Sequence, residues 1–159
     1  MCQMPSVKFA VIGLIGLLTG CASQYDDGLQ KFPVTGLVTI NGEPLQRVVV
    51  ICQNVDPDVK GNAARPVGHT DETGEFHLST NGDNDGAVPG EYIVTFMRSD
   101  ADYSVEGDHF HNKYTDPAKS KFRITIASEE TELRPFDLDV PPEWLAAAKE
   151  SDQRAAARK

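Results

Sequence analysis

The sequence is poor in cysteine, in tryptophan and in basic residues. Its 159 residues include three cysteines and one tryptophan, and 15 Lys and Arg stand against 24 Asp and Glu, which gives a formal net charge of −9. Phosphate binding requires a clustered basic face, whereas the bases of this chain cluster only at its extreme C-terminus. The composition therefore argues against a nucleic-acid partner.

The usual signatures of catalysis are also missing. The sequence contains no His-Glu-x-x-His, no Gly-x-Ser-x-Gly, no Cys-x-x-Cys, no Gly-x-Gly-x-x-Gly and no phosphate-binding loop. We therefore expect that the protein is not an enzyme and that it uses no cofactor.

One apolar run stands out, at residues 9–18, and it follows the basic residue Lys8. It is shorter than the 20 or so apolar residues that a membrane-spanning helix needs, and its layout is that of a signal peptide. The run ends at Leu18-Thr19-Gly20-Cys21, which resembles the lipobox of bacterial lipoproteins. The resemblance implies that residues 1–20 are removed and that Cys21 is lipidated. A cleaved signal with an incidental cysteine, or an uncleaved short anchor, is the alternative interpretation.

The lipobox resemblance implies a place in the cell envelope, with the membrane contacted through lipid on Cys21. Two or three acyl chains hold a protein stably where a single chain does not. Ala22 rather than aspartate follows the cysteine, which, by resemblance to lipoprotein sorting, favours the outer membrane over the inner. Residues 21–33 are polar and lack periodicity, so we expect a tether there.

The remaining cysteine, Cys52, is expected to be a buried and inert thiol. Cys2 would leave with the signal and Cys21 would carry lipid, so Cys52 has no partner for a disulfide. It alternates in register with Val48 and Val50, which places it on their face of a strand.

Residues 34–140 are predicted to form a single all-β domain. β-branched and aromatic stretches alternate there with turn clusters, which is typical of a β-sandwich. The seven predicted antiparallel strands cover residues 34–40, 48–53, 67–70, 75–80, 91–97, 122–127 and 133–140.

Two turns set the expected pairing of these strands. Asn41-Gly42 predicts a hairpin between the first two strands, and residues 71–74 predict a second hairpin in which Thr70 lies opposite Glu75. Alternation then places His77 toward solvent. The residues predicted to face the core are Phe76, Leu78, Thr80, Tyr92, Val94 and Phe96.

Four short motifs lie along these predicted strands. They are Val34-Thr35-Gly36-Leu37-Val38, Gly42-Glu43-Pro44-Leu45, Thr70-Asp71-Glu72-Thr73-Gly74-Glu75-Phe76 and Pro89-Gly90-Glu91-Tyr92. Together they resemble carboxypeptidase regulatory-like domains, which belong to the transthyretin-like, or prealbumin-type, β-sandwich group. Bacterial lipoproteins that carry this one domain are more similar still. They share a Gly-Asp-rich loop, here residues 83–90, and a Lys-Tyr-x-Asp-Pro-x-x-Ser segment, here residues 113–120.

The resemblance implies a transthyretin-like sandwich over residues 34–140, and such a fold confers no activity by itself. The chain departs from the family pattern at Gln46-Arg47, where a small pair is usual, and at Cys52, where a bulky aromatic is usual. It also lacks the metallocarboxypeptidase catalytic domain and the Tyr-Arg-Gly-Ser signature of transthyretin-like hydrolases.

Two loops carry candidate ligands. Residues 81–86 imitate the start of a calcium loop, but the twelfth position is Tyr92 instead of a bidentate glutamate, so we expect a plain connection. The loop at residues 98–121 contains His109 and His111, which with Asp108 or Glu106 would form a loose transition-metal set. We expect no metal site there and interpret the loop as an exposed, solvated acidic segment.

Residues 141–159 are expected to form an exposed, partly helical tail. Proline at its start, an acid in its first turn and bases in its last suit a helix, but its apolar face is thin, so only the first turn should dock.

For the whole protein we expect a non-catalytic, lipid-anchored envelope sandwich that acts as an interaction or structural module, with an unidentified envelope protein or polymer as partner. The alternative is a domain that binds metal or carbohydrate through the 98–121 loop. Carbohydrate is disfavoured because aromatic platforms are scarce and the one tryptophan lies in the tail.

Overall fold

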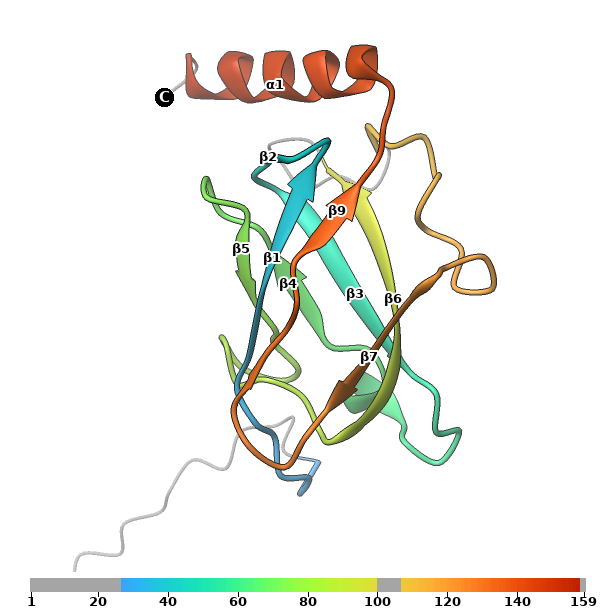
Figure 1. The fold of residues 1–159 in the computed structure, drawn as a ribbon. Helices are drawn as coiled ribbons and strands as arrows, with labels where there is room; N and C mark the ends of the chain where they lie inside the picture. The colour runs from blue at the N-terminus through green and yellow to red at the C-terminus, as the bar shows by residue number, and fades with distance from the viewer. Residues whose placement is uncertain (1–26, 100–106, 158–159) are drawn as a thin grey trace, which may run out of the picture.

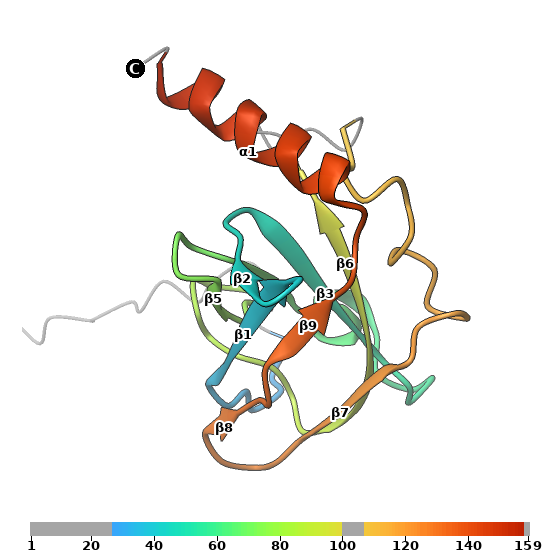
Figure 2. The ribbon, with the colours of Figure 1, turned by 45° about the horizontal axis from the view of Figure 1, so that its top comes forward.

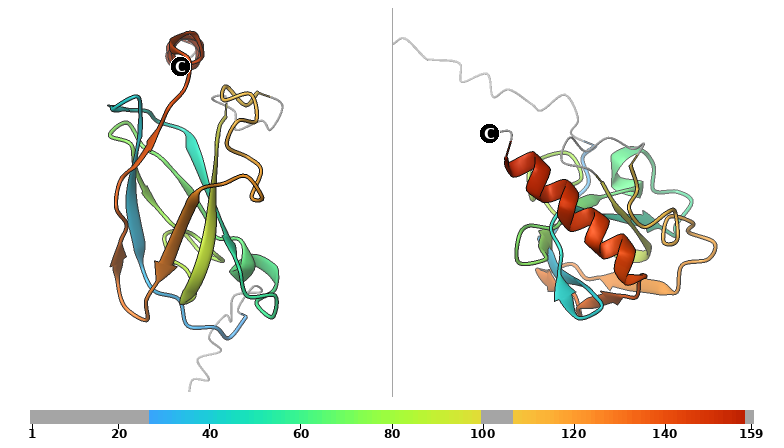
Figure 3. Two further views of the ribbon diagram at one scale, coloured as in Figure 1. Left: turned by 45° about the vertical axis from the view of Figure 1, so that its right-hand side comes forward. Right: turned by 90° about the horizontal axis from the view of Figure 1, so that it is seen from above.

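The computed structural model describes residues 27–99 and 107–157. Two β-sheets face each other, and one α-helix lies across an end of the pair (Figures 1 and 3). The predicted all-β sandwich with a C-terminal helix is confirmed at this level. The signal segment and Cys21 lie outside the described residues. No helix in residues 27–99 or 107–157 is long and apolar enough to cross a membrane.

The first sheet is built around β1 (Val34–Ile40). Strands β2 (Glu43–Pro44) and β5 (Glu75–His77) pair with it antiparallel, whereas β8 (Thr131–Glu132) and β9 (Phe136–Leu138) pair with it in parallel. Buried residues of β1 alternate with half-buried ones, so one face of this sheet is directed to the core.

The second sheet has the order β4–β3–β6–β7 and is wholly antiparallel. It consists of β4 (Val67–His69), β3 (Val48–Asn54), β6 (Gly90–Arg98) and β7 (Phe122–Ile126). Strands β3 and β6 pair over seven residues, from Val48 opposite Arg98 to Asn54 opposite Tyr92. A 3-10 turn, Gly61–Ala64, joins β3 to β4, and the helix α1 covers Pro142–Ala156.

The predictions of seven strands and of a fully antiparallel arrangement are not confirmed. The described residues contain nine strands, two of which run parallel to β1. The strand predicted at 133–140 is wrong in its bounds, because β8 and β9 are separated by residues 133–135. Pro135 has no amide hydrogen to donate to a ladder, so continuous pairing with β1 is interrupted there.

The strands that flank each predicted turn do not pair as we expected. The Asn41-Gly42 turn joins β1 to the two-residue β2, and the chain then crosses to the other sheet. After the second turn, β4 pairs with β3 and β5 pairs with β1. The two segments also meet in a bridge between Val67 and Ser79, which is one residue away from the predicted register. The turn therefore joins the two sheets, because β4 pairs with a longer strand of one sheet and β5 with a longer strand of the other.

The core residues lie between the sheets as the alternation predicts. Phe76, Leu78, Tyr92, Val94 and Phe96 are buried and His77 is exposed, which confirms these predictions, but Thr80 is only half-buried. Three rings meet edge to face at the centre, with centroids 5.2–5.8 Å apart. They belong to Phe96, Phe122 and Phe136.

The last residues of the expected tether are fastened to the sandwich. The backbone of Phe32 exchanges two hydrogen bonds with Ala87, at 2.9 and 3.0 Å. Gly86, with φ +82°, lies so close that a Cβ there would be 1.8 Å from the Phe32 carbonyl oxygen, so this approach requires glycine. Ordered structure thus begins before the predicted boundary at Val34.

Candidate functional site

The helix α1 covers one end of the sandwich (Figures 2 and 3). This end brings together charged residues from three distant parts of the chain. The prediction that only the first turn of the tail docks is wrong. Trp144 is half-buried, Ala148 is fully buried, and Asp152 is directed at two arginines. These residues are four apart and share one helix face.

Asp152 is shared by Arg47 and Arg98. Its Oδ1 accepts a hydrogen bond of 2.5 Å from Arg47 Nη1 and another of 2.5 Å from Arg98 Nη2. The Arg98 side chain is 0% exposed, that of Asp152 is 11% exposed and that of Arg47 is 19% exposed. Arg98 Nη1 also donates to the Ser99 carbonyl oxygen. One carboxylate therefore holds two guanidinium groups, and these three described side chains together carry a net positive charge.

The β3–β6 pairing explains why these arginines meet. Arg98 is the last residue of β6 and lies opposite Val48, so Arg47, immediately before Val48, is brought beside it. Arg47 has φ +62° and its amide donates to the Thr70 carbonyl oxygen at 2.8 Å. Sequence reasoning identified Arg47 only as a departure from the family pattern and did not single out Arg98.

Arg98 is not fully paired within the described residues. Its Nε and the neighbouring Ser99 Oγ are buried, and neither has a hydrogen-bond partner there. Buried polar groups normally find a partner, and a buried guanidinium that lacks one raises the free energy of the folded state.

A second ion pair holds α1 at the surface. Lys149 Nζ lies 2.5 Å from Glu43 Oε2, which joins the helix to β2. The hydrogen bond from Lys149 holds the pKa of Glu43 below its usual value. Both side chains are largely exposed, so this pair contributes little compared with the buried cluster.

The described part of the 98–121 loop is ordered by Asp108. Its carboxylate accepts hydrogen bonds from the backbone amides of Arg98, Phe110 and Asn112, at 2.9, 2.9 and 2.8 Å. Phe110 is buried at 1% exposure. Asp108 therefore ties residues 108–112 to the end of β6. This part of the loop is anchored, contrary to the expectation of an exposed, solvated segment.

The structure does not assemble the candidate metal ligands into a set. His109 and His111 flank the buried Phe110, and the ring of His111 lies 4.5 Å from that of Trp144. The described residues contain no group of three or more His, Cys, Asp or Glu that could hold a metal ion, and Glu106 lies outside them. Trp144 lies in the tail, as the sequence shows, and its ring contacts this loop through His111.

The calcium-like loop uses its central carboxylate to stabilise a turn. Asp85 accepts hydrogen bonds from the backbone amides of Thr80, Asn81 and Gly82, at 2.6, 3.0 and 3.1 Å. Tyr92, at the twelfth position, is fully buried and its hydroxyl donates to the Val88 carbonyl oxygen at 2.8 Å. Asp85 thus serves the turn, and Tyr92 offers no carboxylate at the twelfth position.

Cys52 is enclosed in the core, as predicted. It is 0% exposed, and burial raises the pKa of its thiol to about 12. The thiolate is the reactive form of cysteine, so a thiol held protonated in the core is a poor nucleophile.

A surface hollow of about 380 Å³ is lined by residues of β3 and β6 and of two loops. Its walls include Ile51, Met97 and Arg65, with Thr115 and Pro117 of the following loop. Its lining contains none of the candidate ligands and neither arginine of the cluster.

Comparisons with known proteins give only remote similarities. No family model and no curated protein matches the chain. Among solved structures, a 9R-lipoxygenase from Cyanothece PCC8801 aligns over 69% of this chain and 16% of its own, with 14% identity and a TM-score of 0.37. The dioxygenase domain of a dioxygenase carbohydrate-binding protein fusion from Streptomyces sp. SirexAA-E aligns over 71% of this chain and 82% of its own, with 20% identity and a TM-score of 0.37.

These neighbours correct the expectation that the protein is not an enzyme. Both are named as enzymes or enzyme domains. At a TM-score of 0.37 the likeness assigns neither an activity nor a catalytic residue to it.

Proposed function

We propose that the protein is a lipid-anchored component of the cell envelope, whose sandwich domain acts as an interaction or structural module for an envelope protein or polymer. The observation that carries the proposal is the lipobox-like sequence Leu18-Thr19-Gly20-Cys21, placed eleven residues before Phe32, where the chain is fastened to the sandwich. Lipid on Cys21 would then connect the domain to a membrane, with the outer membrane favoured because Ala22 follows the cysteine.

We also propose that the sandwich is related to the carboxypeptidase regulatory-like, transthyretin-like domains. The residues of the shared motifs occupy positions where the fold constrains them, which supports this relation. Asp71 accepts hydrogen bonds within its turn, Gly74 has φ +80°, and Phe76 and Tyr92 are buried in the core.

Replacement of the lipidated cysteine tests the anchor. Cys21→Ser should abolish incorporation of a labelled fatty acid and shift the protein from the membrane fraction to the soluble fraction, because the acyl chains would provide the attachment. Labelling followed by fractionation under high salt measures both effects.

A matched control is Ser23→Ala, which alters a nearby residue of the expected tether and should leave labelling and fractionation unchanged. Retention of the Cys21→Ser protein on membranes after the salt wash would contradict the proposed anchor. In the wild type, separation of inner and outer membranes should place the protein with the outer membrane.

A further inference from the structure

The cluster of Arg47, Arg98 and Asp152 has features that the proposed function does not explain, and these features do not depend on the lipid anchor. We propose that Arg47 and Arg98 form a binding site for the carboxylates of an acidic peptide segment, and that α1 covers this site by inserting its own Asp152. The helix would then be a displaceable cover, and an acidic segment of a partner would take its place.

The first argument is that the site has binding capacity that Asp152 does not use. Both arginines converge on a single carboxylate oxygen, Oδ1, although a guanidinium can bind both oxygens of a carboxylate through a pair of parallel N–H donors. Arg98 Nε is buried without a partner among the described residues. A segment with two neighbouring acids could supply one carboxylate to each arginine and satisfy donors that now lack an acceptor.

The second argument is the charge of the site. Two guanidinium groups face one carboxylate under α1, in a chain whose formal net charge is −9. Replacing a buried ion pair by apolar residues is often neutral or stabilising, so packing alone does not require a fully buried arginine at the end of β6. An anion that enters this site would be attracted by a local positive charge with little solvent screening.

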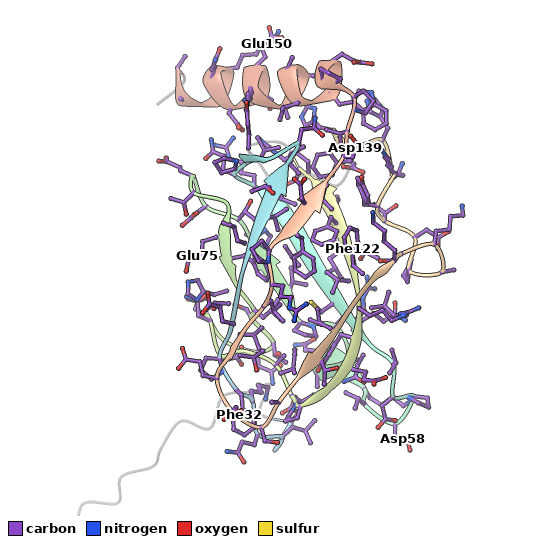
Figure 4. The ribbon with its side chains drawn as sticks, viewed as in Figure 1. Phe32, Asp58, Glu75, Phe122, Asp139 and Glu150 are labelled. Carbon is purple, nitrogen blue, oxygen red and sulfur yellow. The ribbon has the colours of Figure 1, made fainter. Side chains whose placement is uncertain are left out.

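The third argument concerns the way in which the C-terminal half of α1 is held. The buried positions of the helix include the small side chain of Ala148, whereas most of its other residues are half-buried or exposed. Figure 4 shows Glu150 on the side of the helix that faces away from the sandwich. Trp144 and Leu145 pack against the core near the start of the helix, whereas beyond Ala148 the contacts with the sandwich include the exposed Lys149–Glu43 pair and the more buried Asp152 pairs. A competing carboxylate would act directly on the Asp152 pairs.

The occupant is inferred to be an acidic peptide because the group now seated in the site is a peptide carboxylate. Asp152 presents one carboxylate of the chain itself to the arginines, whereas Glu150 lies on the opposite side of the helix. A partner segment with several adjacent acids would present the same chemistry at a higher local density.

Binding of fluorescein-labelled hexaglutamate to the full-length protein in detergent micelles tests the proposal. Asp152→Asn removes the competing charge, so its dissociation constant for the peptide should be at least tenfold lower than that of the wild type. The matched control is Glu150→Gln, which removes the same charge from the exposed side of α1 and should bind like the wild type. Fluorescence anisotropy at low ionic strength measures all three.

Two further variants localise the binding. Adding Arg47→Gln to Asp152→Asn should return the affinity to the wild-type level or below, and labelled hexaglutamine should bind none of the proteins. Equal affinities of the Asp152→Asn and Glu150→Gln proteins would overturn the proposal, because binding would then follow net charge or not occur at this site.

The wild type provides an independent measurement if Asp152→Asn does not fold. Trp144 is the single tryptophan and contacts His111 at the start of α1. Displacement of the helix by unlabelled hexaglutamate should change its emission saturably, whereas hexaglutamine should not. An emission that is unchanged up to millimolar hexaglutamate would overturn the proposal.

Discussion

Phe76 and Tyr92 are fully enclosed between the sheets, whereas His77, next to Phe76 in sequence, is exposed. Phe76→Ala and Tyr92→Ala should each lower the free energy of unfolding by about 3–5 kcal/mol, because each leaves a large cavity. His77→Ala should change it by no more than about 0.5 kcal/mol, as expected of an exposed site. Urea unfolding of the three variants measures the differences. A larger loss for His77→Ala than for Phe76→Ala would contradict the observed register of β5.

The same residue scale shows how well side-chain burial could be predicted from the sequence. Alternation along a strand was sufficient to place Cys52, Phe76 and Tyr92 in the core, because the period of two is a property of the backbone itself. It failed for Thr80, which lies three residues beyond the end of β5 at His77, so strand alternation no longer governs its direction.

At the scale of an element, Asp71 stabilises the turn between β4 and β5. Its Oδ1 accepts hydrogen bonds from the Thr73 hydroxyl at 2.7 Å and from the backbone amides of Thr73 and Glu75 at 2.8 and 3.1 Å. The hydrogen bond from the Thr73 hydroxyl, with those from the amides, holds the pKa of this carboxyl below its ordinary value. Between the lowered pKa and the ordinary pKa of an aspartate, the folded protein therefore binds fewer protons at Asp71 than the unfolded chain does.

The contribution of Asp71 should consequently be present above about pH 4, the ordinary pKa of an aspartate, and should be lost as the pH falls through the lowered pKa. The unfolding free energy of Asp71→Asn should lie below that of the wild type at neutral pH, and the difference should shrink as the pH falls below about 4. Denaturant unfolding between pH 6 and pH 2 measures this. Glu72→Gln, a change in the same turn at an exposed residue, is the control and should show no such trend. A difference that is constant down to pH 2 would contradict the assigned role.

Strand partners and the docking of α1 were the parts of the fold that the sequence could not determine. Turn residues such as Asn41-Gly42 specify a local reversal of the chain, but the sheet in which the next long strand lies depends on which apolar faces must meet. Likewise Asp152 is 54 residues from Arg98 along the chain, and no local pattern identifies a pair so far apart. The spacing of Trp144 and Ala148 was the available signal of a docked helix face.

The candidate metal ligands illustrate the same difficulty at a functional site. His109 and His111 have the spacing of neighbouring ligands on an extended strand, but His111 has φ +49° and its ring packs against Trp144. Asp108 is engaged by three backbone amides. Spacing in sequence predicts a shared face only where the backbone is regular, and this segment is a series of turns.

At the scale of the whole molecule, the point where the chain enters the sandwich and the helix α1 lie at opposite ends. Phe32 marks the entry, and α1 crosses the other end with the arginine cluster beneath it (Figures 1 and 4). A chain of eleven residues from Cys21 to Phe32 spans at most about 40 Å, even when fully extended. A lipid on Cys21 would therefore restrict the entry end to the neighbourhood of the bilayer.

With a lipid on Cys21, this polarity would give the protein a proximal pole and a distal pole, and the acidic-peptide site would belong to the distal one. A ligand would then approach from the aqueous compartment, and lipid headgroups would be poorly placed to compete for the arginines. In vesicles that contain the lipidated protein, bromine-labelled lipids should leave the emission of Trp144 unchanged, whereas aqueous iodide should quench it, as steady-state fluorescence can measure. Strong quenching by the brominated lipids would mean that the domain lies down on the bilayer, with its distal pole turned to the membrane instead of to the partners that it would otherwise meet.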